Sequence, residues 1–125
     1  MNTADKVNFW KTGAVQSLKV AEDLFRLEHY LEALFFGHLA IEKLLKAKIV
    51  KATGSEPIYS HDLVILAKHA KLKLDEKDVD FLARVNVYNI RARYQDYKKS
   101  LYRSANKDFT TQELANIRKF FSRIK

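Results

Sequence analysis

The sequence predicts an all-α fold, a bundle of helices in a single domain over residues 1–125. Apolar residues recur every three or four positions through long stretches, which places them along one face of an α-helix. The chain has only 3 glycines and 1 proline, too few turn residues for most sheet-rich folds. Its 125 residues are enough to bury a core without help from disulfides or a structural metal.

The first two helices are expected to form a long antiparallel hairpin. Over residues 3–27 the apolar positions advance in steps of three and four. Gly13 within this segment costs about 1 kcal/mol against alanine, which indicates a close helix contact. Residues 30–52 are the most apolar segment and are predicted to form the centre of the bundle. The link at Glu28 and His29 is so short that the two helices must be neighbours.

Stop and start signals place the next elements. Gly54 and Pro57 end the second helix, because glycine favours a left-handed cap and proline cannot continue a helix. Ser60 is expected to cap a shorter helix that ends near Lys71. Another helix is expected to begin at residues 75–78, where acidic side chains suit the helix dipole.

The last helix is predicted to begin with a capping box. Thr110 would be its N-cap and Glu113, three residues later, would complete the box. The helix is expected to run to about Ile124. Residues 94–108 lack a clean period and are expected to contain a loop.

The net charge of +8 is concentrated in the last third of the chain. Residues 1–87 carry 13 Lys/Arg against 12 Asp/Glu, whereas residues 88–125 carry 10 against 3. A localised basic excess favours an anionic partner: nucleotide, RNA or an acidic protein. The alternative is that these residues form a solvated basic face with no partner.

Several classes of protein are not expected. The chain has no cysteine, which excludes disulfides and thiolate sites and fits a cytoplasmic location. Residues 1–8 lack the layout of a signal peptide, and charged residues interrupt every apolar run, so no membrane span is predicted. No glycine-rich phosphate loop occurs, and no cofactor is predicted.

The histidines do not predict a metal site. His61 and His69 lie eight positions apart without a third ligand nearby, whereas zinc needs three or four ligands. His38 lies among apolar residues of the second helix, where a lone histidine is more often packed and hydrogen-bonded than a ligand.

A polar cluster lies near the end of the fourth predicted helix. Arginine there can bind phosphate oxygens through two hydrogen bonds, and tyrosines, Tyr88 among them, can stack on a base. The candidate ligand-binding residues are Asn86, Asn89, Arg91, Arg93, Tyr94 and Tyr97. In the alternative interpretation, Arg93 pairs with Asp96 and the tyrosines pack the bundle.

Three blocks of sequence resemble the HEPN family, the higher eukaryotes and prokaryotes nucleotide-binding domain. Residues 33–47 carry an alanine-rich stripe that leads to Glu-Lys-x-x-Lys-Ala. Residues 61–63 read His-Asp-Leu, and residues 92–96 read Ala-Arg-Tyr-Gln-Asp where the family has Ala-Arg-Tyr-Pro-Asp. The blocks occur in family order, and the likeness extends over residues 5–123.

The resemblance implies an up-and-down bundle of four long helices plus a shorter helix, usually a homodimer. It also implies nucleotide or RNA binding, without sequence-specific DNA recognition. Many family members are RNase toxins controlled by a small nucleotidyltransferase encoded beside them. The resemblance therefore implies a nucleotide- or RNA-binding module with such a partner protein, in a toxin–antitoxin-like system.

The RNases of the family carry arginine followed, after four to six residues, by histidine. No histidine follows Arg84, Arg91 or Arg93 at this spacing. The candidate catalytic residues of a metal-independent RNase are then Arg91 or Arg93, to steady a phosphate, and Asp96 as a base. This RNase is one alternative function, and a structural protein-interaction module is the other. The sequence does not decide whether the protein is an enzyme.

Overall fold

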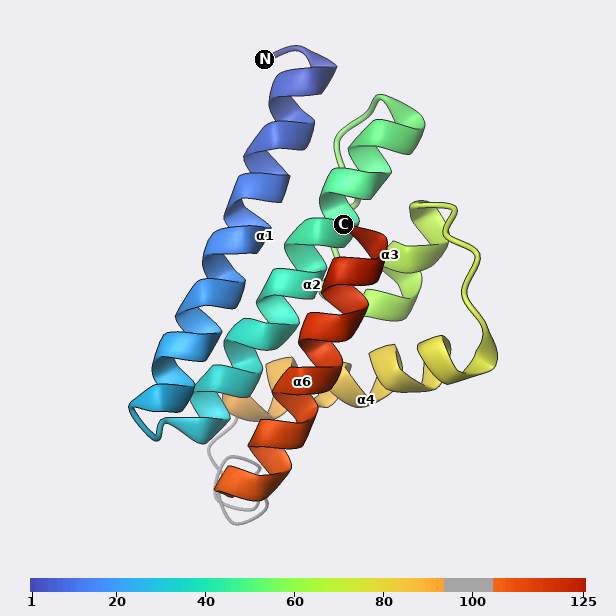
Figure 1. The fold of residues 1–125 in the computed structure, drawn as a ribbon. Helices are drawn as coiled ribbons and strands as arrows, with labels where there is room; N and C mark the ends of the chain where they lie inside the picture. The colour runs from blue at the N-terminus through green and yellow to red at the C-terminus, as the bar shows by residue number, and fades with distance from the viewer. Residues whose placement is uncertain (94–104) are drawn as a thin grey trace.

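The computed structural model describes residues 1–93 and 105–125, with the backbone alone for residues 90–93. The described part contains five helices and confirms the predicted all-α bundle, with four long helices and one shorter helix (Figure 1). Their bounds are α1 Thr3–Arg26, α2 Tyr30–Thr53, α3 Leu63–His69, α4 Glu76–Arg93 and α6 Lys107–Ile124.

The antiparallel hairpin of α1 and α2 is the largest unit of the fold. Each of its helices has 24 residues, and the connecting turn contains Glu28 in a left-handed conformation, with φ of 66°. At the other end of α2, Gly54 adopts φ of 71° and its N–H bonds to the carbonyl of Val50. Both helix ends therefore agree with the signals in the sequence.

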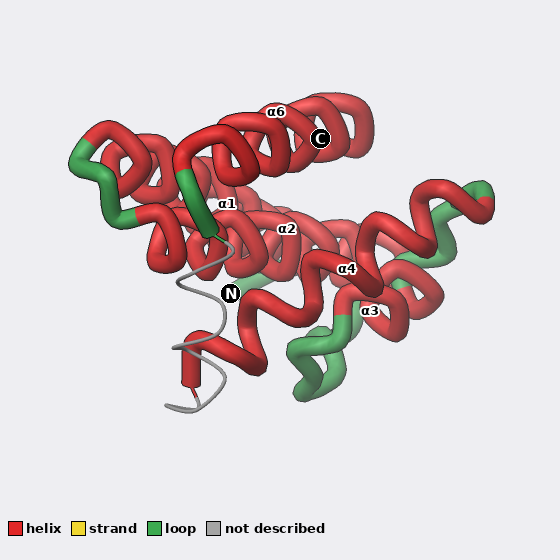
Figure 2. The backbone as a smooth tube through the Cα atoms, turned by 90° about the horizontal axis from the view of Figure 1, so that it is seen from below, coloured by secondary structure: helices red, strands yellow, loops and turns green. Residues whose placement is uncertain are grey.

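Helix α2 is the centre of the bundle, as its apolar sequence predicts. It packs against α1, α3, α4 and α6, and most of its residues are buried. In Figure 2, α6 lies above the hairpin, whereas α3 and α4 lie below it. In Figure 1, α1, α2 and α6 run along the molecule and α4 crosses them.

Gly37 sets the close approach of α2 and α6. A Cβ atom at this position would lie 2.7 Å from Cδ1 of Ile117, which is shorter than real contacts allow. Ile117 is fully buried and belongs to the core. Because glycine has no side chain, Ile117 fits between the two helices at Gly37.

Two predicted helix caps are wrong. Helix α6 starts at Lys107, and its N-cap is Asn106, whose side chain accepts a hydrogen bond from the N–H of Phe109 at 2.8 Å. Thr110 lies inside the helix and is fully buried. Asparagine is as good a cap as threonine, and the earlier start lengthens the buried face of the helix.

The cap of α3 is Asp62 rather than Ser60. The Asp62 carboxylate accepts hydrogen bonds from the N–H groups of Val64 and Ile65. The Ser60 hydroxyl instead accepts from the N–H of Asp62 at 3.1 Å, so it shapes the turn that precedes the helix. Both residue types are good caps, and the tertiary contacts of Asp62 favour the later position.

None of the helices in the described ranges is both long and apolar enough to cross a membrane.

Candidate functional site

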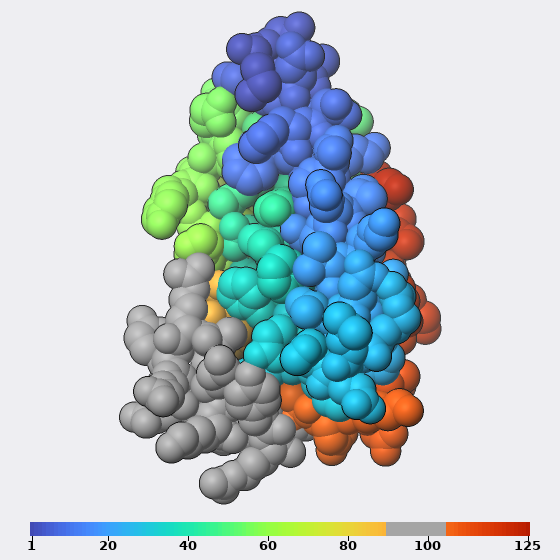
Figure 3. Space-filling model, turned by 90° about the vertical axis from the view of Figure 1, so that its left-hand side faces the viewer, coloured from blue at the N-terminus to red at the C-terminus, as the bar shows by residue number. Residues whose placement is uncertain are grey.

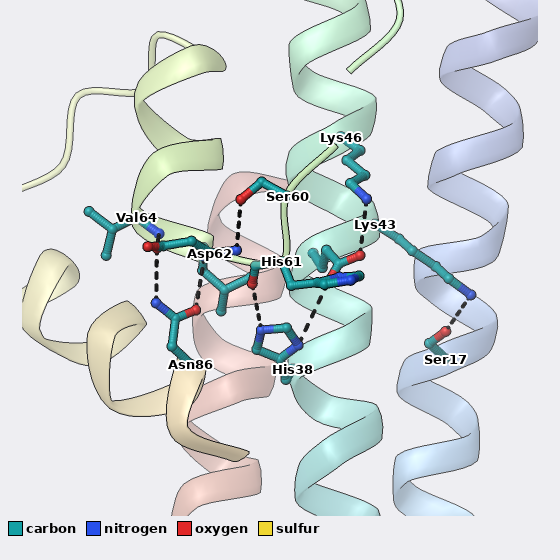
Figure 4. A network of polar contacts seen from close by, with 11 residues as sticks. Ser17, His38, Lys43, Lys46, Ser60, His61, Asp62, Val64 and Asn86 are labelled. Atoms are coloured by element: carbon teal, nitrogen blue, oxygen red, sulfur yellow. Dashed lines mark hydrogen bonds and ion pairs between the residues drawn. The ribbon is translucent and has the colours of Figure 1, made fainter. Parts of the chain in front are cut away.

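Asn86 links α4 to the start of α3. Its side-chain oxygen accepts a hydrogen bond from the N–H of Leu63 at 2.9 Å, and its amide nitrogen donates to Oδ1 of Asp62 at 3.0 Å. Both ends of the amide are thus engaged within the protein (Figure 4). The arrangement joins the His-Asp-Leu segment to the second half of α4.

The other predicted ligand-binding residues lie at or beyond the end of α4. Asn89 is buried, with 8% of its surface exposed. Arg91 and Arg93 occupy the last turn of α4, but only their backbone is described. The remaining positions, Tyr94, Asp96 and Tyr97, lie outside the described residues. The ligand-binding and catalytic roles assigned to this cluster stay predictions.

The carboxylate of Glu113 in α6 accepts hydrogen bonds from a cluster of polar side chains that joins α6 to α4. Arg84 donates to it through Nε at 2.8 Å and through Nη2 at 2.9 Å. The hydroxyl of Tyr88 donates to the same carboxylate, and Asn116 adds a bond at 3.2 Å. Tyr88 is only 3% exposed, so the packing alternative holds for this tyrosine.

The cluster shifts the pKa of its members in opposite directions. Burial raises the pKa of the Glu113 carboxyl, but the hydrogen bonds from Arg84, Tyr88 and Asn116 outweigh it, and the net pKa is lowered. Burial and the bond to Glu113 raise the pKa of the Tyr88 hydroxyl far above its usual range. Glu113 therefore stays ionised and Tyr88 stays protonated at neutral pH.

A basic groove runs between α4 and α6, next to this cluster. It has a volume of about 470 Å³, and its cationic side chains are Lys77, Arg84, Lys119 and Arg123. Asp78 is the carboxylate in its lining. We call this surface the α4/α6 groove. Its four cations and single carboxylate make it suited to an anionic ligand.

Aromatic rings support the two arginines of the α4/α6 groove. Phe81 and Phe120 contact each other with ring centroids 5.5 Å apart. The guanidinium group of Arg84 lies 5.3 Å from the centre of the Phe81 ring, and that of Arg123 lies 5.2 Å from the Phe120 ring. Each arginine is also held by a carboxylate, Glu113 for Arg84 and Asp78 for Arg123. The cations are thus fixed in place before any ligand arrives.

The sequence carries a signal for this groove that lies outside the predicted polar cluster at the end of α4. On α4 the lining residues Lys77, Phe81 and Arg84 follow one another at steps of four and three. On α6 the residues Asn116, Lys119 or Phe120, and Arg123 do the same. Such spacing places each set on one face of its helix. That the two faces meet is visible only in the folded chain.

A second polar network lies around Glu42 of α2, on the other side of the His-Asp-Leu segment (Figure 4). Nδ1 of His61 lies 3.0 Å from one oxygen of Glu42, and Nζ of Lys46 lies 3.1 Å from the other. Nε2 of His38 lies 3.0 Å from the carbonyl oxygen of His61. Burial lowers the pKa of His38, so this histidine is neutral and donates its Nε2–H to the carbonyl.

The described residues contain no group of three or more His, Asp or Glu side chains arranged to hold a metal ion. The Glu42 network joins two parts of the resemblance seen in the sequence, the Glu-Lys-x-x-Lys-Ala block on α2 and the His-Asp-Leu block before α3. Its contacts are internal to the fold and hold the segment around His61 against α2.

Comparison with protein families gives one match, to the family model described as "HEPN domain", over residues 7–125. Neither the curated proteins nor the solved structures give a match to this chain.

Proposed function

Because the chain belongs to the HEPN domain family, we propose that it is a nucleotide- or RNA-binding module that acts with a small nucleotidyltransferase partner. The family is one of nucleotide-binding and RNase-like modules. The observation that carries the binding proposal is the α4/α6 groove, which has four cations, two of them arginines held over aromatic rings.

The groove suits a phosphate backbone. Lys77 and Lys119 are exposed and can move to meet phosphate oxygens as point charges. Arg84 uses Nε and Nη2 for Glu113, and 48% of its side-chain surface remains exposed. An ion pair and a ring hold its guanidinium group in one orientation, so little side-chain entropy is lost when the ligand binds.

We propose RNA as the ligand of this groove because the positive charge of the groove is spread along two helices and is not concentrated at one point. Extended basic surfaces follow a backbone of successive phosphates, whereas a free nucleotide needs a compact pocket. Arg91 and Arg93, on the last turn of α4, extend the same helix toward its C-terminal end.

The proposal includes a homodimer and a toxin–antitoxin-like partnership. This part of the proposal is supported by the family resemblance. In the RNases of the family, the helix that corresponds to α4 meets a second copy of the chain. Sedimentation of the purified chain tests the dimer. The partner is tested by identifying a small nucleotidyltransferase gene next to that of this chain and co-purifying the two co-expressed proteins.

RNA binding is tested by fluorescence anisotropy with a short labelled oligoribonucleotide. Lys119→Glu reverses one charge of the groove, and Lys19→Glu makes the same change at an exposed position of α1. We expect Lys119→Glu to weaken RNA binding about tenfold, since one charge-assisted contact is lost and one repulsion is added. Lys19→Glu is expected to bind like the unmodified protein. The proposal fails if no RNA binds at moderate salt, or if both variants lose affinity equally.

A further inference from the structure

A second pocket opens on α1, with a lining separate from that of the α4/α6 groove. Its volume is about 510 Å³, within the range of small-molecule sites. Phe9, Trp10 and Gly13 of α1 and Lys43 of α2 form most of its lining, to which Asn8 and Gln16 add polar side chains. We call it the α1 pocket. Figure 3 views the molecule from the side on which α1 lies outermost with α2 beside it.

The two aromatic rings of the α1 pocket are placed to receive a planar ring. Phe9 is 60% exposed, an unusual position for a phenylalanine on a helix that has a buried face elsewhere. Its ring stands edge-on to Trp10, with centroids 5.4 Å apart and planes at 81°. The exposed Phe9 ring therefore has surface free for a planar base, and aromatic groups prefer stacked or edge-to-face contacts.

Trp10 is held in position from within the protein. Nζ of Lys46 lies 5.2 Å from the centre of the Trp10 ring system, and the same ammonium group is bonded to Glu42. Lys46 is buried and its charge is balanced by this carboxylate. The cation therefore serves to fix the indole ring, and the ring is rigid before a ligand arrives.

Lys43 brings a positive charge that no described carboxylate balances. Its side chain crosses from α2 to α1 (Figure 4) and donates to the Ser17 hydroxyl at 3.0 Å. It passes directly over Gly13, where a Cβ atom would lie 3.3 Å from Cδ of the lysine. Within residues 1–93 and 105–125, no Asp or Glu forms an ion pair with it. Two of its three N–H donors remain for an anion at the pocket.

We propose that the α1 pocket binds a nucleoside monophosphate, with the base against Phe9 and Trp10 and the phosphate at Lys43. Aromatic rings bind bases of any sequence by stacking, and a single lysine is a sufficient point charge for one phosphate group. The inference rests on the proposed nucleotide-binding function and gives it a second location, away from the path of an RNA backbone. The same chemistry is offered by a free nucleotide and by the 5′-phosphorylated end of an RNA.

Trp10 is the single tryptophan of the chain, so its fluorescence reports on the α1 pocket alone. The protein is titrated with AMP, adenosine, inorganic phosphate and a 5′-phosphorylated oligoribonucleotide. AMP is expected to change the fluorescence saturably, and adenosine to bind roughly tenfold more weakly because it lacks the contact with Lys43. Phosphate alone is expected to leave the signal unchanged. A response to AMP but not to the RNA end identifies a free nucleotide as the ligand, and the reverse identifies the RNA terminus.

Two variants examine the parts of the pocket separately. Lys43→Met keeps the aliphatic chain over Gly13 and removes the charge, and it is matched by Lys19→Met on the exposed face of α1. Phe9→Ser removes an exposed ring, so the fold does not depend on it. We expect Lys43→Met and Phe9→Ser each to weaken the binding of AMP roughly tenfold, and Lys19→Met to leave it unchanged. Circular dichroism confirms that each variant is folded.

The outcomes separate this inference from the proposed function. If Lys119→Glu weakens RNA binding and leaves the AMP titration of Trp10 intact, both stand. If RNA does not bind but AMP does, the groove proposal fails and the pocket survives. The inference is overturned if neither AMP nor the 5′-phosphorylated RNA changes the fluorescence of Trp10, if Lys119→Glu abolishes the AMP response, or if the Trp10 signal follows self-association of the protein instead of added nucleotide.

Discussion

Arg84 of α4 meets Glu113 of α6 in a two-point ion pair, with Nε 2.8 Å from Oε2 and Nη2 2.9 Å from Oε1. The two residues have different surroundings: the Glu113 side chain is 3% exposed and that of Arg84 is 48% exposed. The carboxylate is thus part of the core, and the arginine reaches over it to the surface. Because Arg84 lines the α4/α6 groove, this pair connects the stability of the fold to its candidate ligand surface.

Replacing Glu113 by alanine is expected to lower the free energy of unfolding by about 2–3 kcal/mol. The change leaves the buried Tyr88 hydroxyl without its acceptor and removes the partner of Arg84. The loss is smaller than for a fully buried pair because Arg84 is half exposed. Urea denaturation measures it, with Asp108→Ala, at an exposed position of the same helix, as the matched control. Equal midpoints for the two variants would contradict the role given to Glu113.

The stability of the fold is expected to decline as the pH falls below about 6.5 because of His38. Burial lowers its pKa from 6.5 in the folded protein. The unfolded chain therefore takes up a proton before the folded chain does, and acid favours unfolding. Glu42 and His61 are the titratable groups that face His38. Unfolding free energies measured between about pH 7.5 and about pH 5.5 should fall in the unmodified protein. They should change less in His38→Gln, and an equal pH dependence in both would remove His38 as the cause.

Gly37→Ala is expected to destabilise the protein by about 1–2 kcal/mol, since the new methyl group collides with Cδ1 of Ile117. The steric cost itself is larger than this net value, because the better helix propensity of alanine offsets about 1 kcal/mol of it. Ile117→Val removes the colliding atom, so the double variant should be more stable than the sum of the two single changes predicts. Thermal denaturation of all four proteins gives the coupling. Strict additivity would show that the contact is not the source of the strain.

RNA affinity is expected to fall with rising salt, because binding at a basic groove releases counterions from the phosphate backbone. Lys119→Met should reduce the slope of log affinity against log salt by roughly 1. Lys19→Met, its control on α1, should leave the slope as it is. Anisotropy titrations at several salt concentrations measure both. An unchanged slope in Lys119→Met would show that this lysine contacts no phosphate.

Asn106→Ala is expected to cost about 1 kcal/mol of stability, as is usual for loss of an N-cap. The side chain of Asn106 accepts the N–H of Phe109, which has no partner within the helix. Thr111→Ala, one turn later on the exposed side of α6, is the control and should cost less. A larger loss of stability in Thr111→Ala than in Asn106→Ala would show that Asn106 does not cap the helix.

Much of the secondary structure was predictable because its causes are local. The turn around Glu28, the left-handed Gly54 and the acidic start of α4 depend on residues within a few positions of one another. The errors at Ser60 and Thr110 have a local cause too. Each lies close to a second residue, Asp62 or Asn106, that caps a helix equally well. Sequence alone does not rank two good caps.

The candidate surfaces were less predictable because they depend on residues far apart in the chain. Glu42 and His61 are 19 positions apart, and Arg84 and Glu113 are 29 apart. The local spacing predicts Glu113 as part of a capping box, whereas the fold pairs its buried carboxylate with Arg84. In the same way, the sequence predicts Asn86 as a ligand-binding residue, whereas in the fold its amide is engaged with Asp62 and Leu63.

By itself the sequence determined that this chain is helical, where most of its helices begin and end, and which family its motifs resemble. These properties follow from 3.6-residue periodicity and from hydrogen bonds between near neighbours, which the order of residues specifies directly. Only the tertiary structure decided that Lys43 lies over Gly13 and that the cations of α4 and α6 share one groove. Such meetings depend on how whole helix faces pack, and the packing energy is set by the fit of distant side chains.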